Sequence, residues 1–339
     1  MSFGWLASHR LALSALVALS GVAAAGAALV LRARRRRGKG AQLARLETQV
    51  GGHRFEEGKV GLFQAGGKVY KPFGSGSRGD REVAFYRLME EEPAMARLRP
   101  YTAHFFGVEE REFPDLGRLR LLVLEDLTAP FAHPSVADIK LGRSLYGSSK
   151  SSLKAAHSVL CNAAQAATGF RVVGMRVYRQ VTGTYMFFDR HFGRKLHGEE
   201  VSFALRMFLD SGHPYLRVDI LEEVLTQLRG LRQVLRESIP YRICSSSMLI
   251  LYEGDCPRVQ LSDVRDDSIP DPTHTPNVRL ALIDIAHYER LPEGERDEEL
   301  IDALGRLVDA FEAVHKFAKE NGTDGAQAHA ARELAGQGK

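Results

Sequence analysis

An acid and a base two residues apart offer the clearest chemistry in this chain. Asp138 and Lys140 lie within Pro134–Gly142, which reads P-S-V-A-D-I-K-L-G. On an extended strand alternate side chains project to one face, so the carboxylate and the ammonium would face the same way. A carboxylate there can orient or deprotonate an attacking hydroxyl, and the ammonium can hold a phosphoryl group under attack. An Asp-x-Lys spacing alone has little specificity.

Three further positions could hold phosphates or a metal ion. Asp284 interrupts an apolar strand, where a lone carboxylate is costly unless it is paired or bound to a metal. Ser247 begins another apolar strand and offers the oxygen ligand that Mg²⁺ prefers. Lys71 ends an early hairpin and could neutralise nucleotide phosphates, with Glu82 of the following helix as its partner. The alternatives are a hydrogen bond at a strand end for Ser247 and a solvated surface position for Lys71.

The elements that must position these residues fall into two groups. Residues 59–130 read as a small N-lobe of strands and one helix, and residues 131–320 as a larger C-lobe. Within the C-lobe, residues 242–252 and 279–285 are predicted strands, and a tail over residues 321–339 is predicted to be disordered. We therefore expect an α+β fold of two lobes, with the cleft between them as the natural ligand site.

Charge and cysteine content limit the classes of partner. Residues 1–46 hold eight of the 46 lysines and arginines and none of the 42 acidic residues, so the rest of the chain is mildly acidic. An acidic body argues against nucleic-acid binding. Three cysteines without a paired spacing are typical of a reducing compartment.

The N-terminal segment predicts a membrane anchor. After a leader over residues 1–10, residues 11–31 carry no charge and would span about 30 Å as a helix, the thickness of a bilayer core. A basic linker over residues 32–58 follows, and its run Arg32–Arg37 would stay cytoplasmic and could bind anionic lipid headgroups. We therefore expect a membrane-anchored protein with a cytoplasmic body. A cleaved signal peptide, an organellar transit peptide and a soluble cytoplasmic or nuclear protein are the alternatives.

The full pattern P-x-x-x-D-x-K-x-G resembles the signature of the inositol polyphosphate kinase family. Further motifs occur in the same order as in the family: Gly174–Tyr178, Phe192–Leu196, Ser245–Leu249 and Leu282–His287. The resemblance covers most of residues 59–317. Met248 stands where the family has Leu, and Ile285 where it has Phe.

The resemblance implies a two-lobed, kinase-like fold with an ATP cleft, and roles for the residues above. Asp138 would act on the attacking group, and Lys140 would hold the γ-phosphoryl group of ATP. Asp284, helped by Ser247, would bind Mg²⁺. The resemblance also assigns nucleotide phosphates to Lys71 and adenine contacts to the Glu125 carbonyl and the Leu127 amide.

The resemblance further implies an inositol polyphosphate substrate, phosphorylated on a hydroxyl or on an existing phosphate. Its candidate contacts are Arg143, Lys150, Lys154 and Lys195. We expect a monomer. The alternative is a catalytically silent, membrane-tethered binder of inositol phosphates or phosphoinositides, against which the intact acids and Lys140 argue.

Overall fold

The protein is described from a computed structural model. It divides into two compact units, residues 1–44 and 45–339, and every described helix and strand lies in the second unit apart from Ala44. The residues that the structure describes are 43–51, 55, 60–74, 76–143, 163–196, 198–213, 216–255 and 277–321.

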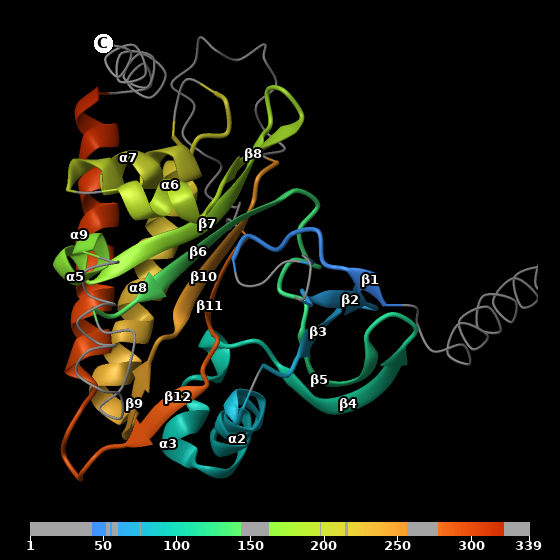
Figure 1. Ribbon diagram of the computed structural model, residues 1–339. Coiled ribbons are helices and arrows are strands. Elements are labelled where there is room, and N and C mark those ends of the chain that lie inside the picture. The colour runs from blue at the N-terminus through green and yellow to red at the C-terminus, as the bar shows by residue number, and fades with distance from the viewer. Residues whose placement is uncertain are drawn as a thin grey trace, which may run out of the picture. The chain divides into compact units, whose positions relative to one another are not determined.

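The first sheet has the strand order β1-β2-β3-β5-β4 (Figure 1). The strands are β1 Ala44–Arg45, β2 Phe63–Ala65, β3 Lys68–Pro72, β4 Phe105–Phe113 and β5 Gly117–Glu125. Gly66 and Gly67 both have positive φ, as a tight hairpin turn requires, and they fix the register of β2 against β3. Helix α2 (Arg78–Glu91) packs on this sheet, where Tyr86 stacks on Phe105 with ring centroids 5.3 Å apart.

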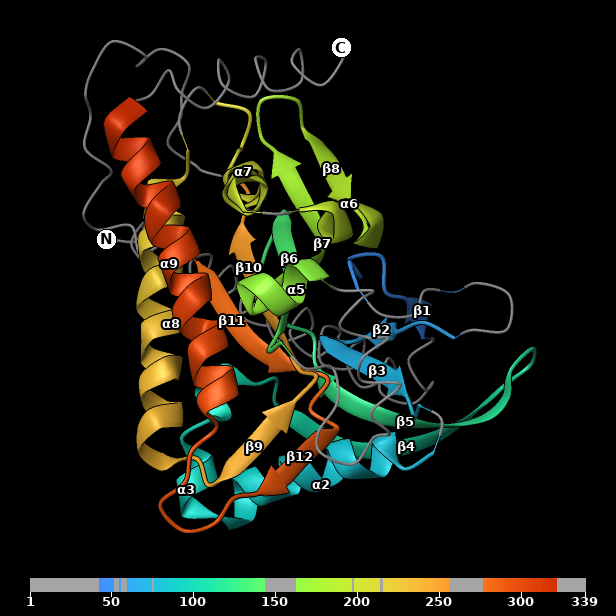
Figure 2. The same cartoon turned by 60° about the vertical axis from the view of Figure 1, so that its left-hand side comes forward.

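The second sheet is antiparallel throughout, with the order β11-β10-β6-β7-β8. Its strands are β6 Pro134–Leu141, β7 Phe170–Arg179, β8 Thr184–Phe188, β10 Ser247–Glu253 and β11 Val278–Ile283. Helices α8 (Val218–Ser238) and α9 (Glu298–Asn321) lie side by side along one face of this sheet (Figure 2). Apolar residues of α8 recur at helical spacing and are fully buried, for example Val224, Leu228 and Leu231.

Shorter elements complete the described fold. They are α3 Pro93–Ala96, the 3₁₀ turn η1 Arg99–Tyr101, α5 Ala163–Thr168, α6 Arg190–Lys195 and α7 Glu199–Phe208. In addition, β9 (Tyr241–Cys244) and β12 (His287–Arg290) pair in a separate antiparallel ladder.

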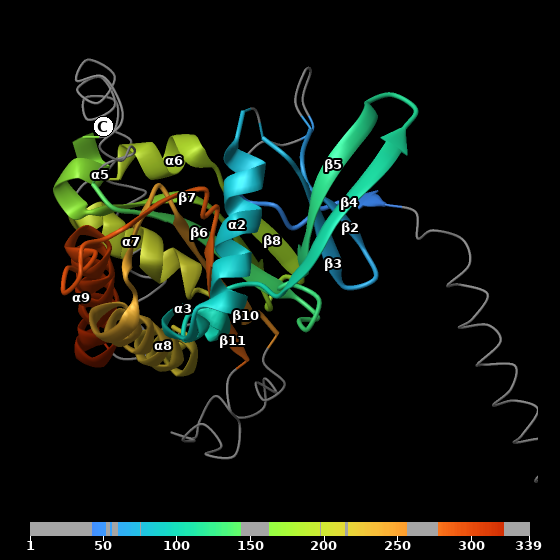
Figure 3. The same ribbon diagram turned by 90° about the horizontal axis from the view of Figure 1, so that it is seen from below.

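Helix α2 connects the first sheet to this separate ladder, and Figure 3 shows it between the first sheet and the larger group of elements. Arg81 Nε donates to the Ala286 carbonyl at 2.8 Å. The ring of Phe85 packs edge-on against Tyr288 at 5.1 Å between centroids. Helix α2 therefore links the first sheet to the segment that contains Ala286 and Tyr288.

Two predicted strands are each broken in the structure. Residues 242–252 split into β9 and β10 at Ser245, and the strand predicted over residues 279–285 ends at Ile283, just before Asp284. The cause is local: Ser245 has φ 59° and Asp284 has φ 62°, a left-handed conformation that cannot continue a strand. The paired strands β10 and β11 thereby pass together into the ladder of β9 and β12.

The predicted α+β class is confirmed. The predicted lobe boundaries at residues 59–130 and 131–320 stay predictions.

The predicted membrane localisation requires a correction. Over the part of the chain that the structure describes, no helix combines the length and the apolar character needed to cross a bilayer. The segment predicted as an anchor, residues 11–31, and the basic run Arg32–Arg37 lie outside the described residues. The finding contradicts the membrane-anchored localisation, and we withdraw that prediction.

The left-handed conformation of Ser245 predicts a specific stability difference between two variants. We expect Ser245→Val to lower the free energy of unfolding by about 1–2 kcal/mol relative to Ser245→Asn. The branched Cβ of valine clashes with the backbone at positive φ, whereas asparagine tolerates this region. Urea unfolding of both variants measures the difference, and equal stabilities would contradict the strained turn.

Candidate active site

A cavity of about 580 Å³ is lined by residues from both sheets and from α2. Six residues predicted from the sequence to belong to a site line this cavity. They are Lys71, Glu125, Leu127, Asp138, Lys140 and Asp284. The fold therefore gathers side chains from β3, β5, β6 and the turn after β11 around one space.

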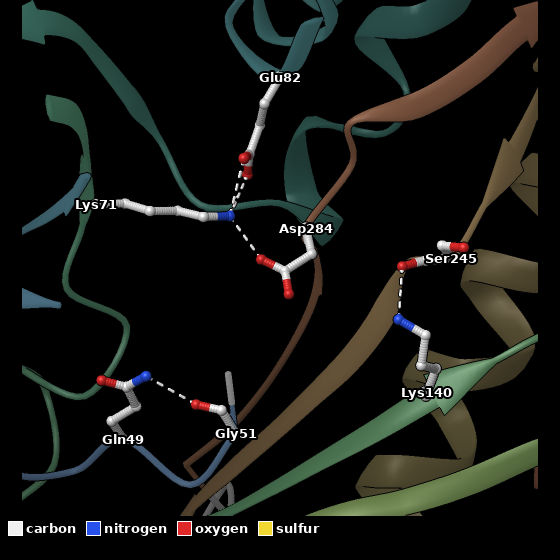
Figure 4. Close-up of polar contacts among 7 residues, drawn as sticks. All are labelled: Gln49, Gly51, Lys71, Glu82, Lys140, Ser245 and Asp284. Carbon is white, nitrogen blue, oxygen red and sulfur yellow. Dashed lines mark hydrogen bonds and ion pairs between the residues drawn. The ribbon is translucent and has the colours of Figure 1, made fainter. Parts of the chain in front are cut away.

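Lys71 lies between two carboxylates, as Figure 4 shows. Its Nζ lies 2.8 Å from both oxygens of Glu82 and 2.5 Å from Asp284 Oδ1. The predicted pairing of Lys71 with Glu82 is thus confirmed, and Asp284 is an additional partner. Burial opposes the charge on Lys71, but the two carboxylates outweigh it and raise the pKa of the ammonium above its ordinary value.

The two acids beside Lys71 have different environments. Asp284 is half exposed toward the cavity, and the charge of Lys71 is the main reason that its pKa lies below the ordinary value. Glu82 is buried, and burial raises its pKa although Lys71 opposes the rise. Asp284 is therefore the acid that stays ionised and accessible at the cavity.

Asp138 and Lys140 share one face of β6, as the alternation of a strand predicts. Val136, Asp138 and Lys140 line the cavity, whereas the alternate residues Ile139 and Leu141 pack in the main core. A register shift against β7 follows Asp138, which pairs with Gly174. The strand is thus anchored by its apolar face and presents its charged face to the cavity.

Asp138 is 4% exposed although it lines the cavity. Burial is the main cause that raises its pKa to about 6, and the charge of Asp284 adds to the rise. A hydrogen bond from Ser247 and the charge of Lys140 oppose it. Oδ1 of Asp138 has no hydrogen-bond partner among the described residues, so one oxygen remains to accept a proton.

Lys140 is positioned by the broken strand. Its Nζ donates to the Ser245 carbonyl at 3.0 Å, and this carbonyl belongs to the left-handed turn between β9 and β10 (Figure 4). Burial lowers the pKa of Lys140, while the charges of Asp284 and Asp138 act in the opposite direction. The Lys140 ammonium is therefore attracted by both acids, and the Ser245 carbonyl holds it in place.

One part of the cavity is apolar. Its lining there includes Val69, Ala103, Leu124, Leu127 and Leu249. Glu125, the last residue of β5, also lines the cavity, and its amide donates to the His104 carbonyl at 2.9 Å. A flat aromatic ring would fit such surroundings.

The remaining predicted residues lie elsewhere. Lys150 and Lys154 lie outside the described residues. Arg143 is exposed and pairs with Asp302 at 3.4 Å, and Lys195 is exposed in the last turn of α6. Ser247 is buried and donates to Asp138, so the structure gives it a different immediate partner from the predicted metal ion. Roles in binding substrate or metal stay predictions for all five residues.

The prediction from sequence missed two basic residues that line the cavity, Arg171 and Arg78. Arg171 lies on β7 directly opposite Lys140, and burial is the main cause that lowers its pKa. Knowledge that β7 pairs with β6 would have indicated it. Residues 46–51, which fall within the predicted linker, also contribute to the lining.

Comparison with known proteins identifies a family for this chain. The family model named Inositol polyphosphate kinase matches residues 121–312. Inositol hexakisphosphate kinase 3 of Homo sapiens is 35% identical over 190 residues, which cover 52% of this chain and 45% of that protein. Inositol hexakisphosphate kinase 2 of Rattus norvegicus is 29% identical over 273 residues, which cover 71% and 63%. The chain thus spans less than two thirds of these curated relatives.

Solved structures agree with this result. The inositol phosphate multikinase Ipk2 from S. cerevisiae, solved in complex with ADP and Mn²⁺, has a TM-score of 0.57 and 26% identity. The match covers 73% of this chain and 99% of that one. A second inositol phosphate multikinase structure, with a TM-score of 0.54 and 21% identity, supports the fold. The resemblance drawn from the motifs and the predicted two-lobed fold are confirmed.

The raised pKa of Asp138 predicts a pH-dependent stability difference. In the folded protein the carboxyl stays protonated up to about pH 6, against an ordinary value of 3.8. Its favourable contribution is therefore complete below about pH 4 and is lost as the pH rises through about 6. Relative to Asp138→Asn, the wild-type protein should lose roughly 3 kcal/mol of stability between pH 4 and pH 7.

Urea unfolding of both proteins in the presence of a chelator, at pH steps across this range, measures the effect. A stability difference that is independent of pH would contradict the buried environment of Asp138.

Proposed function

The chain belongs to the inositol polyphosphate kinase family, and from this we propose that it transfers the γ-phosphoryl group of ATP to an inositol polyphosphate. One observation carries the proposal: Lys71, Asp138, Lys140 and Asp284 line a single cavity. These four residues supply the charges that phosphoryl transfer needs, two cations for phosphate oxygens and two acids with different proton affinities.

The nucleotide would occupy the part of the cavity nearest the first sheet. Its base would lie in the apolar part beside Leu127, with the Glu125 carbonyl and the Leu127 amide as predicted contacts. Lys71 would neutralise phosphate oxygens, and Glu82 holds the lysine in place from α2. The buried Glu82 carboxylate keeps the Lys71 ammonium charged and fixes its orientation through charge-assisted hydrogen bonds.

Asp284 fits a divalent cation that is shared with nucleotide phosphates. It is ionised and half exposed at the cavity. Within the described residues no group of three His, Cys, Asp or Glu could hold a metal ion. Mg²⁺ suits such a site because it is commonly bound by one or two carboxylates together with phosphates and water, and it would neutralise charge on the phosphates.

Asp138 and Lys140 would act on the transfer itself. Lys140 would hold the phosphoryl group as the acceptor oxygen bonds to phosphorus and the bond to the ADP oxygen breaks. For a hydroxyl acceptor, the proton would pass to Asp138, whose pKa of about 6 suits a base near neutral pH. Because the transition state is loose, the position of the carboxylate matters more than its basicity.

The acceptor would lie on the β7 side of the cavity. Arg171 of β7 is a basic residue there that could contact substrate phosphates, and Arg78 at the start of α2 lines the same cavity. Arg143, Lys150, Lys154 and Lys195 stay predicted contacts. We propose that the acceptor group is a hydroxyl or an existing phosphate of an inositol polyphosphate, as the names of the multikinase and hexakisphosphate kinase relatives suggest.

A substrate panel tests the proposed function. The purified protein is incubated with ATP, Mg²⁺ and each of a series of inositol phosphates, and the products are read by phosphorus NMR. A new ester signal identifies a hydroxyl acceptor, and a pyrophosphate signal identifies a phosphate acceptor. If no member yields product while inositol phosphates still bind, the catalytically silent binder is the better description.

Substitution of the acid and the base should separate chemistry from binding. We expect Asp138→Asn to reduce kcat at least about 100-fold, and Lys140→Met to do the same, because each removes a group that acts on the transferring phosphoryl. ATP binding, measured by calorimetry, should stay within a few-fold of wild type for Asp138→Asn. Wild-type turnover in either variant would exclude the assigned role.

A further inference from the structure

Residues 46–51 form a segment that covers one side of the catalytic carboxylate, and we call it the covering segment. It is fixed to the residue before β2 at two points. The Leu46 amide donates to the Leu62 carbonyl at 2.9 Å, and the Leu62 amide donates to Gln49 Oε1 at 3.3 Å. Gln49 Nε2 also donates to the Gly51 carbonyl at 2.8 Å (Figure 4), so one side chain links the segment to Leu62 and shapes its end.

The end of this segment lies directly against Asp138. A Cβ at Gly51 would lie 1.9 Å from Asp138 Oδ2 and 2.9 Å from its Cγ. Real carbon atoms do not approach an oxygen so closely, so no side chain can be added unless the carboxylate or the segment moves. Glycine at this position therefore lets the backbone touch the carboxylate and exclude water from one of its sides.

A second close approach fixes the segment against the sheet. A Cβ at Gly174, the partner of Asp138 on β7, would lie 2.3 Å from the Val50 carbonyl oxygen. The segment is thus held between Leu62 on one side and the β6–β7 pair on the other. Two glycines bring three backbones together around one carboxylate, and Asp138 is 4% exposed as a result.

We propose that Gly51 is a positioning residue for the proposed phosphoryl transfer, acting through Asp138. The covering segment blocks the Oδ2 side of the carboxylate and so fixes its rotation. Oδ1 is itself buried and has no hydrogen-bond partner among the described residues, so the segment determines which way this unsatisfied oxygen is turned. This inference rests on the proposed function, and it adds a residue that acts through its contact with Asp138.

The kinetic test is Gly51→Ala. We expect kcat to fall at least about tenfold, because a misplaced catalytic group is costly. The KM values for ATP and for the inositol phosphate should stay within twofold, because the added methyl group displaces the Asp138 carboxylate and removes no cationic or base-contacting group. Wild-type kcat in a folded Gly51→Ala protein would overturn the proposal, and so would a loss that is confined to KM.

The matched control is Gly230→Ala in α8. A Cβ there would lie 2.5 Å from Tyr101 Oη, a clash that is less severe than at Gly51 but also with the end of a polar side chain, and Gly230 does not line the cavity. We expect wild-type kcat for this variant. An equal loss of kcat in both variants would show a general effect of destabilisation and would overturn the specific role of Gly51.

A double-mutant cycle read by Tm tests the contact without any activity. In the parent protein, Gly51→Ala should lower Tm by several degrees. In an Asp138→Ala background the clashing carboxylate is gone, so the same change should cost little, whereas Gly230→Ala should cost the same in both backgrounds. Additive effects for Gly51→Ala would overturn the inference.

Two further results, a failure to fold and an absence of turnover, can be told apart from a failure of this inference. If Gly51→Ala alone does not fold, folding of the double variant supports the carboxylate clash, and failure of the double variant to fold overturns it. If the parent protein shows no turnover on any inositol phosphate, the proposed function fails, while the Tm cycle still decides whether Gly51 and Asp138 are coupled.

Discussion

The site depends on a constraint in the backbone, the paired departure of two strands from the second sheet at Ser245 and Asp284. Among the described residues these are the two non-glycine positions with positive φ. Such a conformation costs on the order of 1–2 kcal/mol for each residue. Both positions serve the cavity: the Ser245 carbonyl holds Lys140, and Asp284 carries the carboxylate that meets Lys71. Strain at a site that packing over-determines is a common way to hold functional groups.

The same geometry gives two nearby carboxylates different proton affinities. Asp284 follows the strand and faces the cavity beside Lys71, so its ionised form is favoured. Asp138 lies within β6 under the covering segment, so its neutral form is favoured, and the charge of Asp284 strengthens that preference. Pairs of titratable groups whose environments separate their pKa values often mark the acid and the base of a site. The fold assigns each acid its environment through burial and one lysine.

The sequence alone predicted the parts of the site that depend on local pattern. Alternation along β6 indicated that Asp138 and Lys140 share a face, and the interval from Lys71 to Glu82 indicated a strand-to-helix pair. The breaks at Ser245 and Asp284 could not be predicted, because each is followed or preceded by a strand-forming apolar run and no glycine marks either turn. Arg171 was missed because its place in the site depends on the strand that it faces. The membrane assignment followed the length of an uncharged segment and the basic run after it, both of which lie outside the described residues.

The composition of the covering segment also led to a wrong expectation, that these residues are only a linker. Residues 46–51 are short, polar and glycine-containing, which locally is typical of a linker. Their glycine has another physical basis, since a Cβ at Gly51 would occupy the position of the Asp138 carboxylate. A glycine that permits flexibility and a glycine that permits close approach look identical in a sequence. They differ in what surrounds them, and here the surroundings are a buried acid and a second glycine on the facing strand. A segment of this kind gains its order from the sheet that it covers, so its structural role exists only once β6 and β7 have paired.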